Sequence, residues 1–154
     1  MIAREIMQTR FHTLSPRDTI ADAVKHFQTA IEDERKKVFG LMVTDDNDHL
    51  LGMLSMYDIM LFIQPKHAHI WGEMDDIDPS QLYDERLEKV KSILVDDIMT
   101  PEVVTITPDA HLMVIADIMI KKHIRRLPVV DGPEVVGIVF VSDVFHHLLR
   151  KFMV

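Results

Sequence analysis

The sequence of 154 residues has no cysteine, only five glycines and no long apolar run. The lack of cysteine excludes disulfides, thiolate metal sites and cysteine nucleophiles. Five glycines are too few for an extended glycine-rich phosphate loop, and neither a P-loop nor a Gly-x-Gly-x-x-Gly motif occurs. One of the longest apolar runs, Val135–Val141, has seven residues, whereas a membrane-spanning helix needs about 18. Because the N-terminus also lacks a signal-peptide pattern, we expect a cytoplasmic protein without membrane insertion.

Positive charge is also scarce, since 17 Lys and Arg stand against 25 Asp and Glu, a net charge of −8. A dedicated nucleic-acid binder normally carries a basic face, so we expect no nucleic-acid partner. The segment Glu73–Asp97 holds nine acids and three bases, and therefore most of the negative charge. We interpret this segment as a solvated face or a surface for a partner.

The chain repeats itself. Residues 6–16 align with the residues 92 positions later, sharing Ile-Met, a Thr and a Ser/Thr-Pro pair. Residues 52–58 align with the residues 85 positions later. Because the offset falls from 92 to 85, we expect about seven additional residues in the first copy, around 31–37. Each copy reads as strand, helix, strand, strand, helix, and about 60 residues are too few to bury much core alone. We therefore expect an α/β fold of two βαββα repeats related by a pseudo-twofold axis, with a cleft between them.

The repeat sets the expected boundaries: a first repeat at 1–63, an insert at 64–96 and a second repeat at 97–154. Strands are expected at 11–14, 41–44 and 50–54 in the first copy, and at 103–106, 127–130 and 135–140 in the second. Ser15-Pro16 and Thr107-Pro108 predict helix N-termini, and the last helix of each copy should begin near Asp58 and Asp143. The insert contains Trp71, the only tryptophan. It should span the repeats, with a helix running from Pro79 or Ser80 to about Leu94.

Several motifs in this order resemble the cystathionine-β-synthase (CBS) domain, and their duplication resembles a Bateman module. The second copy carries Ile98-Met99-Thr100-Pro101, Arg126-Leu127-Pro128-Val129-Val130-Asp131 and Gly137…Asp143; the first carries Ile6-Met7, Thr13 and Gly52…Ser55…Asp58. The resemblance implies a non-catalytic regulatory module that senses an adenine nucleotide (AMP, ADP or ATP) in the cleft between the repeats. S-adenosylmethionine is the less favoured ligand, and no cofactor is obligatory. It also implies a homodimer that regulates another, unknown protein.

The same resemblance implies the binding residues. They are Thr13, Ser55 and Asp58 in the first copy, and Thr105, Arg125, Arg126, Ser142 and Asp143 in the second. The chemistry suits a nucleotide, because a carboxylate accepts from two vicinal ribose hydroxyls and a helix N-terminus or an arginine attracts phosphate. In the first copy Gly40 and Leu41 align with the two arginines, so we expect the second copy to hold the nucleotide. The first copy would bind weakly, bind an uncharged adenosine compound or stay empty.

Each of these residues has a plainer interpretation. Ser55 and Asp58 have the spacing of a helix capping box, and Ser142 with Asp143 could also be a helix cap without ligand. The basic run 121–126 could be a solvated surface. The nine histidines, with His67, His69, His146 and His147 the densest, lack the spacing of a helical zinc site. We therefore expect surface histidines and no metal site, and expect methionines at apolar positions to fill the core (Met7, Met42, Met53, Met99, Met113 and Met119).

No catalytic constellation emerges from the sequence, because nothing indicates a nucleophile, a base and an orienting group in one place. We therefore expect that the protein is not an enzyme, and a hydrolase or transferase acting on nucleotides is disfavoured. The alternative function is a protein-interaction or scaffold module with empty clefts. Its partner surface would be the insert, with Trp71 and the acidic residues after it.

Overall fold

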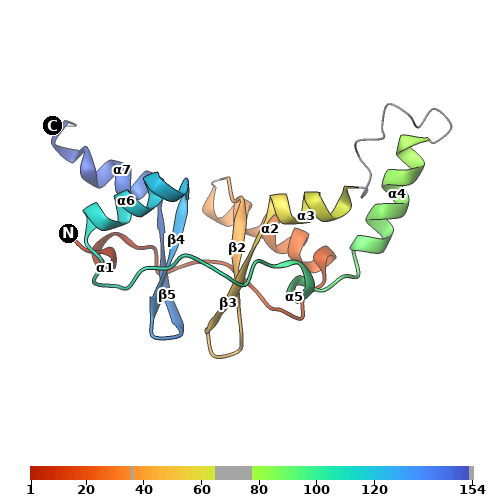
Figure 1. Cartoon of the computed structure of the whole chain (residues 1–154), viewed down its shortest axis with the longest axis horizontal. Coiled ribbons are helices and arrows are strands. Elements are labelled where there is room, and N and C mark those ends of the chain that lie inside the picture. Colours follow the sequence, from red (N-terminus) through yellow and green to blue (C-terminus); the bar gives the residue numbers. More distant parts are fainter. Residues whose placement is uncertain (36, 65–77, 153–154) are drawn as a thin grey trace. The chain divides into compact units, whose positions relative to one another are not determined.

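The structure, a computed structural model, describes residues 1–35, 37–64 and 78–152 (Figure 1). The chain divides into two units. The central unit consists of His12–Thr44 and Leu51–Pro101, and the C-terminal unit consists of Met1–Phe11, Asp45–Leu50 and Glu102–Val154. Trp71, the acidic residues Glu73, Asp75 and Asp76, and the pair His67 and His69 lie outside the described residues. The interpretations attached to them therefore remain expectations.

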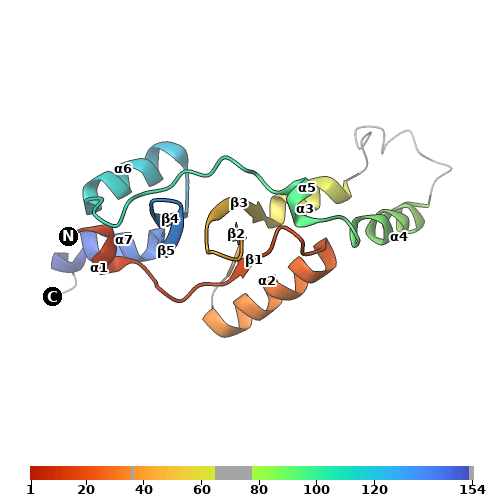
Figure 2. The same cartoon turned by 90° about the horizontal axis from the view of Figure 1, so that it is seen from below.

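The central unit contains a three-stranded sheet in the order β1-β2-β3, in which β1 runs parallel to β2. Its elements are β1 (Thr13–Leu14), α2 (Ile20–Glu34), β2 (Gly40–Thr44), β3 (Leu50–Ser55), α3 (Met56–Ile63), α4 (Pro79–Val90) and α5 (Val95–Ile98). Every residue of β2 is buried, as expected for a middle strand that is covered on both faces. Leu14, Phe27, Val43 and Leu54 belong to one apolar core beneath α2. Figure 2 shows α2 along this sheet.

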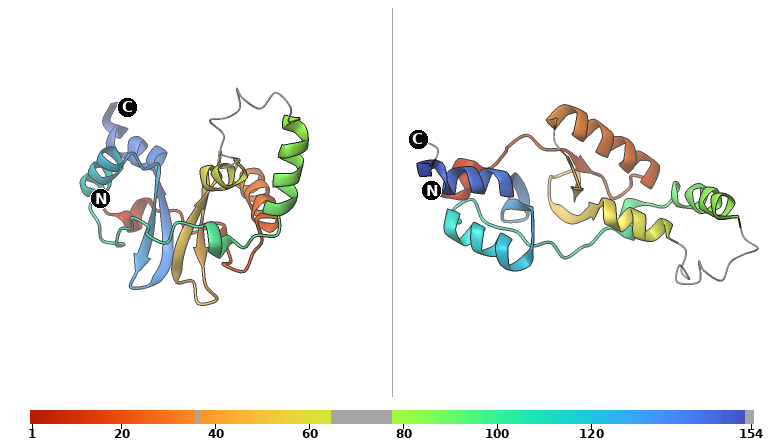
Figure 3. Two further views of the ribbon diagram at one scale, coloured as in Figure 1. Left: turned by 45° about the vertical axis from the view of Figure 1, so that its right-hand side comes forward. Right: turned by 90° about the horizontal axis from the view of Figure 1, so that it is seen from above.

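The C-terminal unit is built on an antiparallel hairpin of β4 and β5, with Arg126 opposite Phe140 at its open end. Its elements are α1 (Ala3–Ile6), α6 (Leu112–Lys122), β4 (Arg126–Asp131), β5 (Glu134–Phe140), α7 (Val141–Leu148) and a short 3₁₀ helix, η2 (Arg150–Phe152). Ile6, Ile115, Leu127 and Val139 share its core. Figure 3 shows α6 and α7 at the end of the hairpin opposite its turn. The α/β class predicted from the sequence is confirmed.

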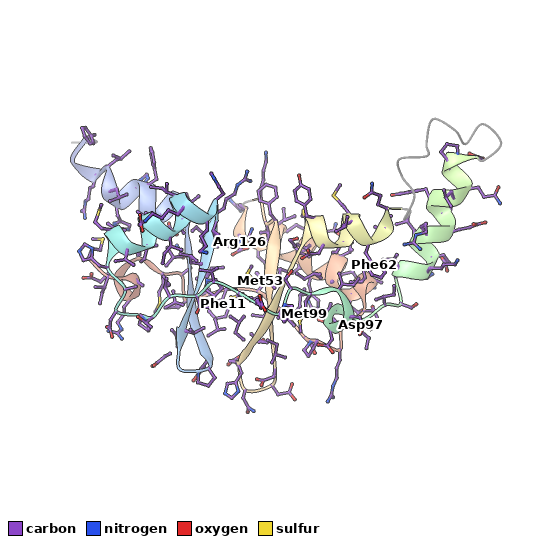
Figure 4. The ribbon with its side chains drawn as sticks, in the orientation of Figure 1. Phe11, Met53, Phe62, Asp97, Met99 and Arg126 are labelled. Atoms are coloured by element: carbon purple, nitrogen blue, oxygen red, sulfur yellow. The ribbon has the colours of Figure 1, made fainter. Side chains whose placement is uncertain are left out.

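Each unit contains the leading segment of the other copy. The backbone of Gln8 pairs with Ile138 on β5, through N–H to O distances of 2.8 and 3.0 Å. In the central unit, Thr100 pairs in the same way with Met53 on β3, at 2.8 and 2.9 Å; Figure 4 labels Met53 and Met99 there. The repeated Ile-Met motif therefore packs on the sheet of the copy to which it does not belong in sequence.

Both first helices begin later than predicted. Helix α2 begins at Ile20 because Thr19 forms a capping box with Asp22, with side-chain hydrogen bonds of 3.0 and 3.1 Å. The expected cap, Ser15, instead closes a turn in which its N–H donates to the Asp18 carboxylate at 2.9 Å. In the second copy, His111 caps α6. The prediction that Ser15-Pro16 and Thr107-Pro108 start the helices was therefore wrong by four residues.

The additional residues of the first copy lie mostly where the offset placed them. Helix α2 has 15 residues and α6 has 11. Both helices end at a residue in the left-handed conformation, Arg35 with φ 51° and His123 with φ 53°, so these ends are equivalent. Four residues separate Arg35 from β2, whereas two separate His123 from β4. The added length therefore lies in the helix end and the connection that follows it.

Three further expectations need correction. The strand expected at 103–106 is only a bridge between Ile106 and Val129, because the next partner along β4, Pro128, has no N–H for the ladder. The helix of the insert ends at Val90 rather than Leu94, and α5 follows it after a turn. Met113 was expected in the core, but it is 59% exposed. In the described ranges, no helix combines the length and apolar character needed to cross a bilayer.

Candidate functional site

Ser55 and Asp58 form a complete capping box at the start of α3. The Asp58 N–H donates to Ser55 Oγ at 3.0 Å, and the Ser55 N–H donates to Asp58 Oδ2 at 2.8 Å. The capping interpretation of this pair is therefore confirmed. Both residues are half-buried, so the carboxylate keeps some contact with solvent while the backbone of β3 fixes its orientation.

The start of α7 is built differently. Phe140 occupies the cap position and makes no side-chain capping hydrogen bond. Ser142 lies within the first turn and is exposed, so the interpretation of Ser142 as a helix cap was wrong. Asp143 is half-buried, and Gln8 Nε2 donates to its Oδ2 at 3.5 Å. The aspartates of the two copies thus occupy equivalent helix positions with different partners.

The two arginines lie beside the N-terminus of α7. The backbone N–H of Val141 donates to the carbonyl of Arg125 at 2.8 Å, and Arg126 faces Phe140 across the hairpin. Figure 4 labels Arg126 at this end of β4. Arg125 is exposed and Arg126 is half-buried. The pairing of β4 with the last residues of β5 therefore brings Arg125, Arg126, Ser142 and Asp143 together from segments about 15 residues apart.

The central unit shows which residues replace the arginines. Here the N–H of Met56 donates to the carbonyl of Phe39 at 2.8 Å, which is the counterpart of the bond between Val141 and Arg125. Phe39 and Gly40 are thus equivalent to Arg125 and Arg126, and the alignment with Gly40 and Leu41 was wrong by one residue. The offset of 85 holds only after the turn that follows β2, because that turn is longer in the first copy. The conclusion that no basic residue stands here is unchanged.

The two threonines lie one strand away from the helix starts. Thr13 pairs with Met42, two residues along β2 from Gly40, and Thr105 precedes the bridge from Ile106 to β4. Both threonines are half-buried. Because strand residues rise about 3.3 Å each, Thr13 lies within the length of a nucleoside from the start of β2. The structure thus places Thr13 on the strand next to β2 and Thr105 in the segment next to β4, each in the unit of its own site.

Gln8 is the residue that the sequence reasoning missed. It belongs to the leading segment of the first copy, yet its side chain meets Asp143 in the second copy. The aligned position in the other copy is Thr100, so the repeat itself gave no reason to single out a glutamine. Only the pairing of Gln8 with Ile138 reveals the contact.

The arrangement brings together groups whose chemistry suits phosphate oxygens and hydroxyls. An arginine fork and a helix N-terminus both attract phosphate oxygens, and a nearby carboxylate can accept from hydroxyls. Among the residues that the structure describes, no group of three His, Asp or Glu side chains could hold a metal ion.

Comparisons with known proteins identify the family and the fold of the chain. The chain is 30% identical over 146 residues to the chloroplastic CBS domain-containing protein CBSX2 of Arabidopsis thaliana, covering 90% of this chain and 59% of that protein. It therefore spans little more than half of that relative's length. A crystal structure of CBSX2 in complex with AMP superposes with a TM-score of 0.69 and 24% identity, covering 98% of both chains. The cytosolic domain of the Mg²⁺ channel MgtE in complex with ATP has a TM-score of 0.70 and 22% identity, covering 95% of this chain and 48% of that one.

These two structures are less than 25% identical to the chain, so they establish the fold alone. The family is established by the sequence, because residues 3–65 and 95–150 each match the CBS domain. These two segments contain the duplicated strands and helices described above, with α1 and α5 at their respective starts. The chain belongs to the CBS-domain family and carries the domain twice, as a Bateman module.

Proposed function

We propose that this protein is a regulatory module that binds an adenine nucleotide at the start of α7, in the second copy. The observation that carries the proposal is the hydrogen bond from Val141 N–H to the Arg125 carbonyl, at 2.8 Å. This bond joins the two arginines to the helix that carries Asp143. One site therefore offers both the positive charge for a phosphate and a carboxylate for a ribose.

Each side chain then has a defined role. Asp143 accepts hydrogen bonds from the ribose hydroxyls, and Arg125 and Arg126 bind the phosphate. Ser142, exposed in the first turn of α7, donates its hydroxyl to a phosphate oxygen beside the helix N-terminus. Thr105 contacts the ribose or the base from the segment that bridges to β4 at Ile106.

The first copy offers a poorer site for phosphate. Its helix start carries Asp58 and Ser55, joined in the capping box, while Phe39 and Gly40 stand where the arginines stand in the second copy. A site of this kind, with Thr13 beside it, binds a nucleotide weakly, takes an uncharged adenosine compound or stays empty.

The comparisons support the ligand class. CBSX2 has been crystallised with AMP and the MgtE cytosolic domain with ATP, and both share the fold of this chain. We further propose that the protein is not an enzyme, that it acts in the cytoplasm and that it transmits its signal to another chain.

The exposed apolar residues of the last helices support pairing with a second copy. In the central unit, Tyr57 of α3 is 83% exposed and Leu61 is 69% exposed; in the C-terminal unit, Phe145 of α7 is 61% exposed. Exposed apolar side chains on a helix mark an interaction site. The same side chains favour the alternative function, in which the module binds a partner protein and no nucleotide.

Calorimetric titration with AMP, ADP, ATP and S-adenosylmethionine tests the proposal. We expect the wild-type protein to bind at least one adenine nucleotide, and Arg126→Ala and Asp143→Ala each to weaken binding about 10- to 100-fold, because both remove hydrogen bonds to a charged group. Lys121→Ala is the matched control. It removes one positive charge from the same stretch, but Lys121 pairs with Asp117 on α6 at 3.0 Å.

The control should bind within about twofold of the wild type, since an exposed charge away from the ligand is screened by salt. If no nucleotide binds at millimolar concentration, the proposed function is wrong. If binding occurs and Asp143→Ala leaves it unchanged, the site has been assigned to the wrong residues.

A further inference from the structure

The backbone of Gln8 is paired with β5 next to the helix start that carries Asp143. Its backbone N–H donates to the Ile138 carbonyl at 2.8 Å, and the Ile138 N–H donates back at 3.0 Å. Ile138 lies on β5 two residues before Phe140, the cap of α7. Because these bonds use only main-chain atoms, they place the side chain of residue 8 beside α7 without depending on its identity.

The Gln8 side chain is exposed, and it forms a hydrogen bond to Asp143 in addition to the backbone pairing. Its Nε2 donates to Asp143 Oδ2 at 3.5 Å, which is longer than the usual N–H···O distance of about 2.7–3.2 Å. A contact of this length contributes little to folding, but it favours one orientation of a carboxylate that would otherwise sample several.

The equivalent aspartate of the first copy is oriented by other means. Asp58 Oδ2 accepts from the Ser55 N–H at 2.8 Å within a capping box that the Ser55 hydroxyl completes. Phe140 caps α7 without a side-chain hydrogen bond and no capping box joins it to Asp143. The donor to Asp143 arrives instead from the leading segment of the first copy.

We propose that Gln8 is a positioning residue for Asp143, whose carboxamide fixes the carboxylate to accept both hydroxyls of a ribose. This inference rests on the proposed function and adds that the site prefers a ribose to a 2′-deoxyribose. A carboxylate has about four lone-pair positions, so Asp143 can accept from Gln8 and from two vicinal hydroxyls at the same time. A 2′-deoxyribose offers only one of these hydroxyls and gains less from the fixed orientation.

Two variants separate positioning from simple packing. Gln8→Ala removes the donor and keeps both backbone hydrogen bonds. Gln8→Glu keeps nearly the same shape but places a second carboxylate against Asp143. Thr100→Ala is the matched control, because Thr100 holds the equivalent position on β3, with backbone bonds of 2.8 and 2.9 Å to Met53.

The experiment combines calorimetry with AMP and 2′-deoxy-AMP and the carboxyl ¹³C resonance of Asp143 in the unliganded protein. For Gln8→Ala we expect a shifted Asp143 resonance, AMP binding weakened about 3- to 10-fold, and a smaller preference for AMP over 2′-deoxy-AMP. Gln8→Glu should weaken AMP binding further, because like charges repel at this distance, and added salt should reduce the difference. Thr100→Ala should match the wild type in all three measurements, and the melting temperatures should stay alike.

The possible failures are distinguishable. Nucleotide binding by the wild type, together with an unchanged Asp143 resonance and an unchanged ribose preference in Gln8→Ala, overturns the role of Gln8 and leaves the proposed function intact. If Gln8→Glu binds AMP as tightly as the wild type, only the shape of the side chain matters, and the role of Gln8 as a donor to Asp143 is also overturned. A wild-type protein that binds no nucleotide overturns the proposed function and the role of Gln8 together.

Discussion

The exchange of leading segments predicts that Gly52 on β3 is intolerant of any side chain. A Cβ atom added at position 52 would lie 2.7 Å from the backbone carbonyl oxygen of Thr100 and 2.9 Å from Met99 Sδ. The methionine can rotate away, but the carbonyl cannot move without breaking the pairing of Thr100 with Met53. Overpacking of about 1–3 kcal/mol, together with two backbone hydrogen bonds at a net of about 0.5–1.5 kcal/mol each, gives a loss of roughly 2–6 kcal/mol for Gly52→Ala.

That loss is a large part of a typical domain stability of roughly 5–15 kcal/mol, so urea unfolding will measure it. Hydrogen exchange adds the local readout, because the amides of Met53 and Thr100 should lose protection. Gly132→Ala is the control: its φ of +61° strains an alanine, but nothing lies within 4 Å of the added Cβ, so those amides should keep their protection. If Gly52→Ala retains the wild-type stability and amide protection, residues 98–101 do not pack on β3 as described.

Three further predictions concern local interactions. Thr19→Ala should destabilise the protein by about 1 kcal/mol, and Ser15→Ala should destabilise it less, because only Thr19 caps α2. Thermal unfolding of the two variants measures the difference, and equal losses of stability would contradict the assigned helix start. The backbone N–H of His49 donates to the Asp45 carboxylate and lowers its pKa below the ordinary value. The ionised carboxylate therefore stabilises the fold fully above its unfolded pKa, and this stabilisation is lost as the pH falls through its folded pKa. The stability of Asp45→Asn should depend less steeply on pH in this range, and an unchanged pH dependence would refute the contribution. Arg86→Ala removes hydrogen bonds of 2.7 and 3.3 Å from α4 to the last two carbonyls of α3. The amide hydrogens of α4 should then exchange with solvent faster. Unaltered hydrogen exchange would show that Arg86 does not hold α4 in place.

The sequence predicted the elements well where the signal was local and repeated. The hairpins and the last helices follow from short motifs, Gly52…Asp58 and Gly137…Asp143, and the observed starts of α3 and α7 lie two residues before the aspartates. The start of α6 was missed because its cap, His111, is not one of the preferred N-cap residues. The start of α2 was missed because two patterns fit the capping rule. Ser15 with Asp18 and Thr19 with Asp22 have the same spacing, and only tertiary contacts select the second pair.

Other differences arise from contacts between distant segments. The missing strand before α6 follows from Pro128, which is visible in the sequence, but its effect depends on which residue it faces across the sheet. The contact between Gln8 and Asp143 joins residues 135 positions apart, and no local pattern encodes such a pairing. The candidate aspartates and arginines could therefore be selected from the sequence, whereas the residue that orients Asp143 could not.

The central claim is that a nucleotide binds at the start of α7, and an amide ¹H–¹⁵N titration with AMP tests it most directly. We predict that the largest shifts occur at Val141, Ser142 and Asp143 and at the arginines beside them, with smaller shifts at Met56–Asp58 of the first copy. Largest shifts at Met56–Asp58, or no shifts at saturating AMP, would contradict the account.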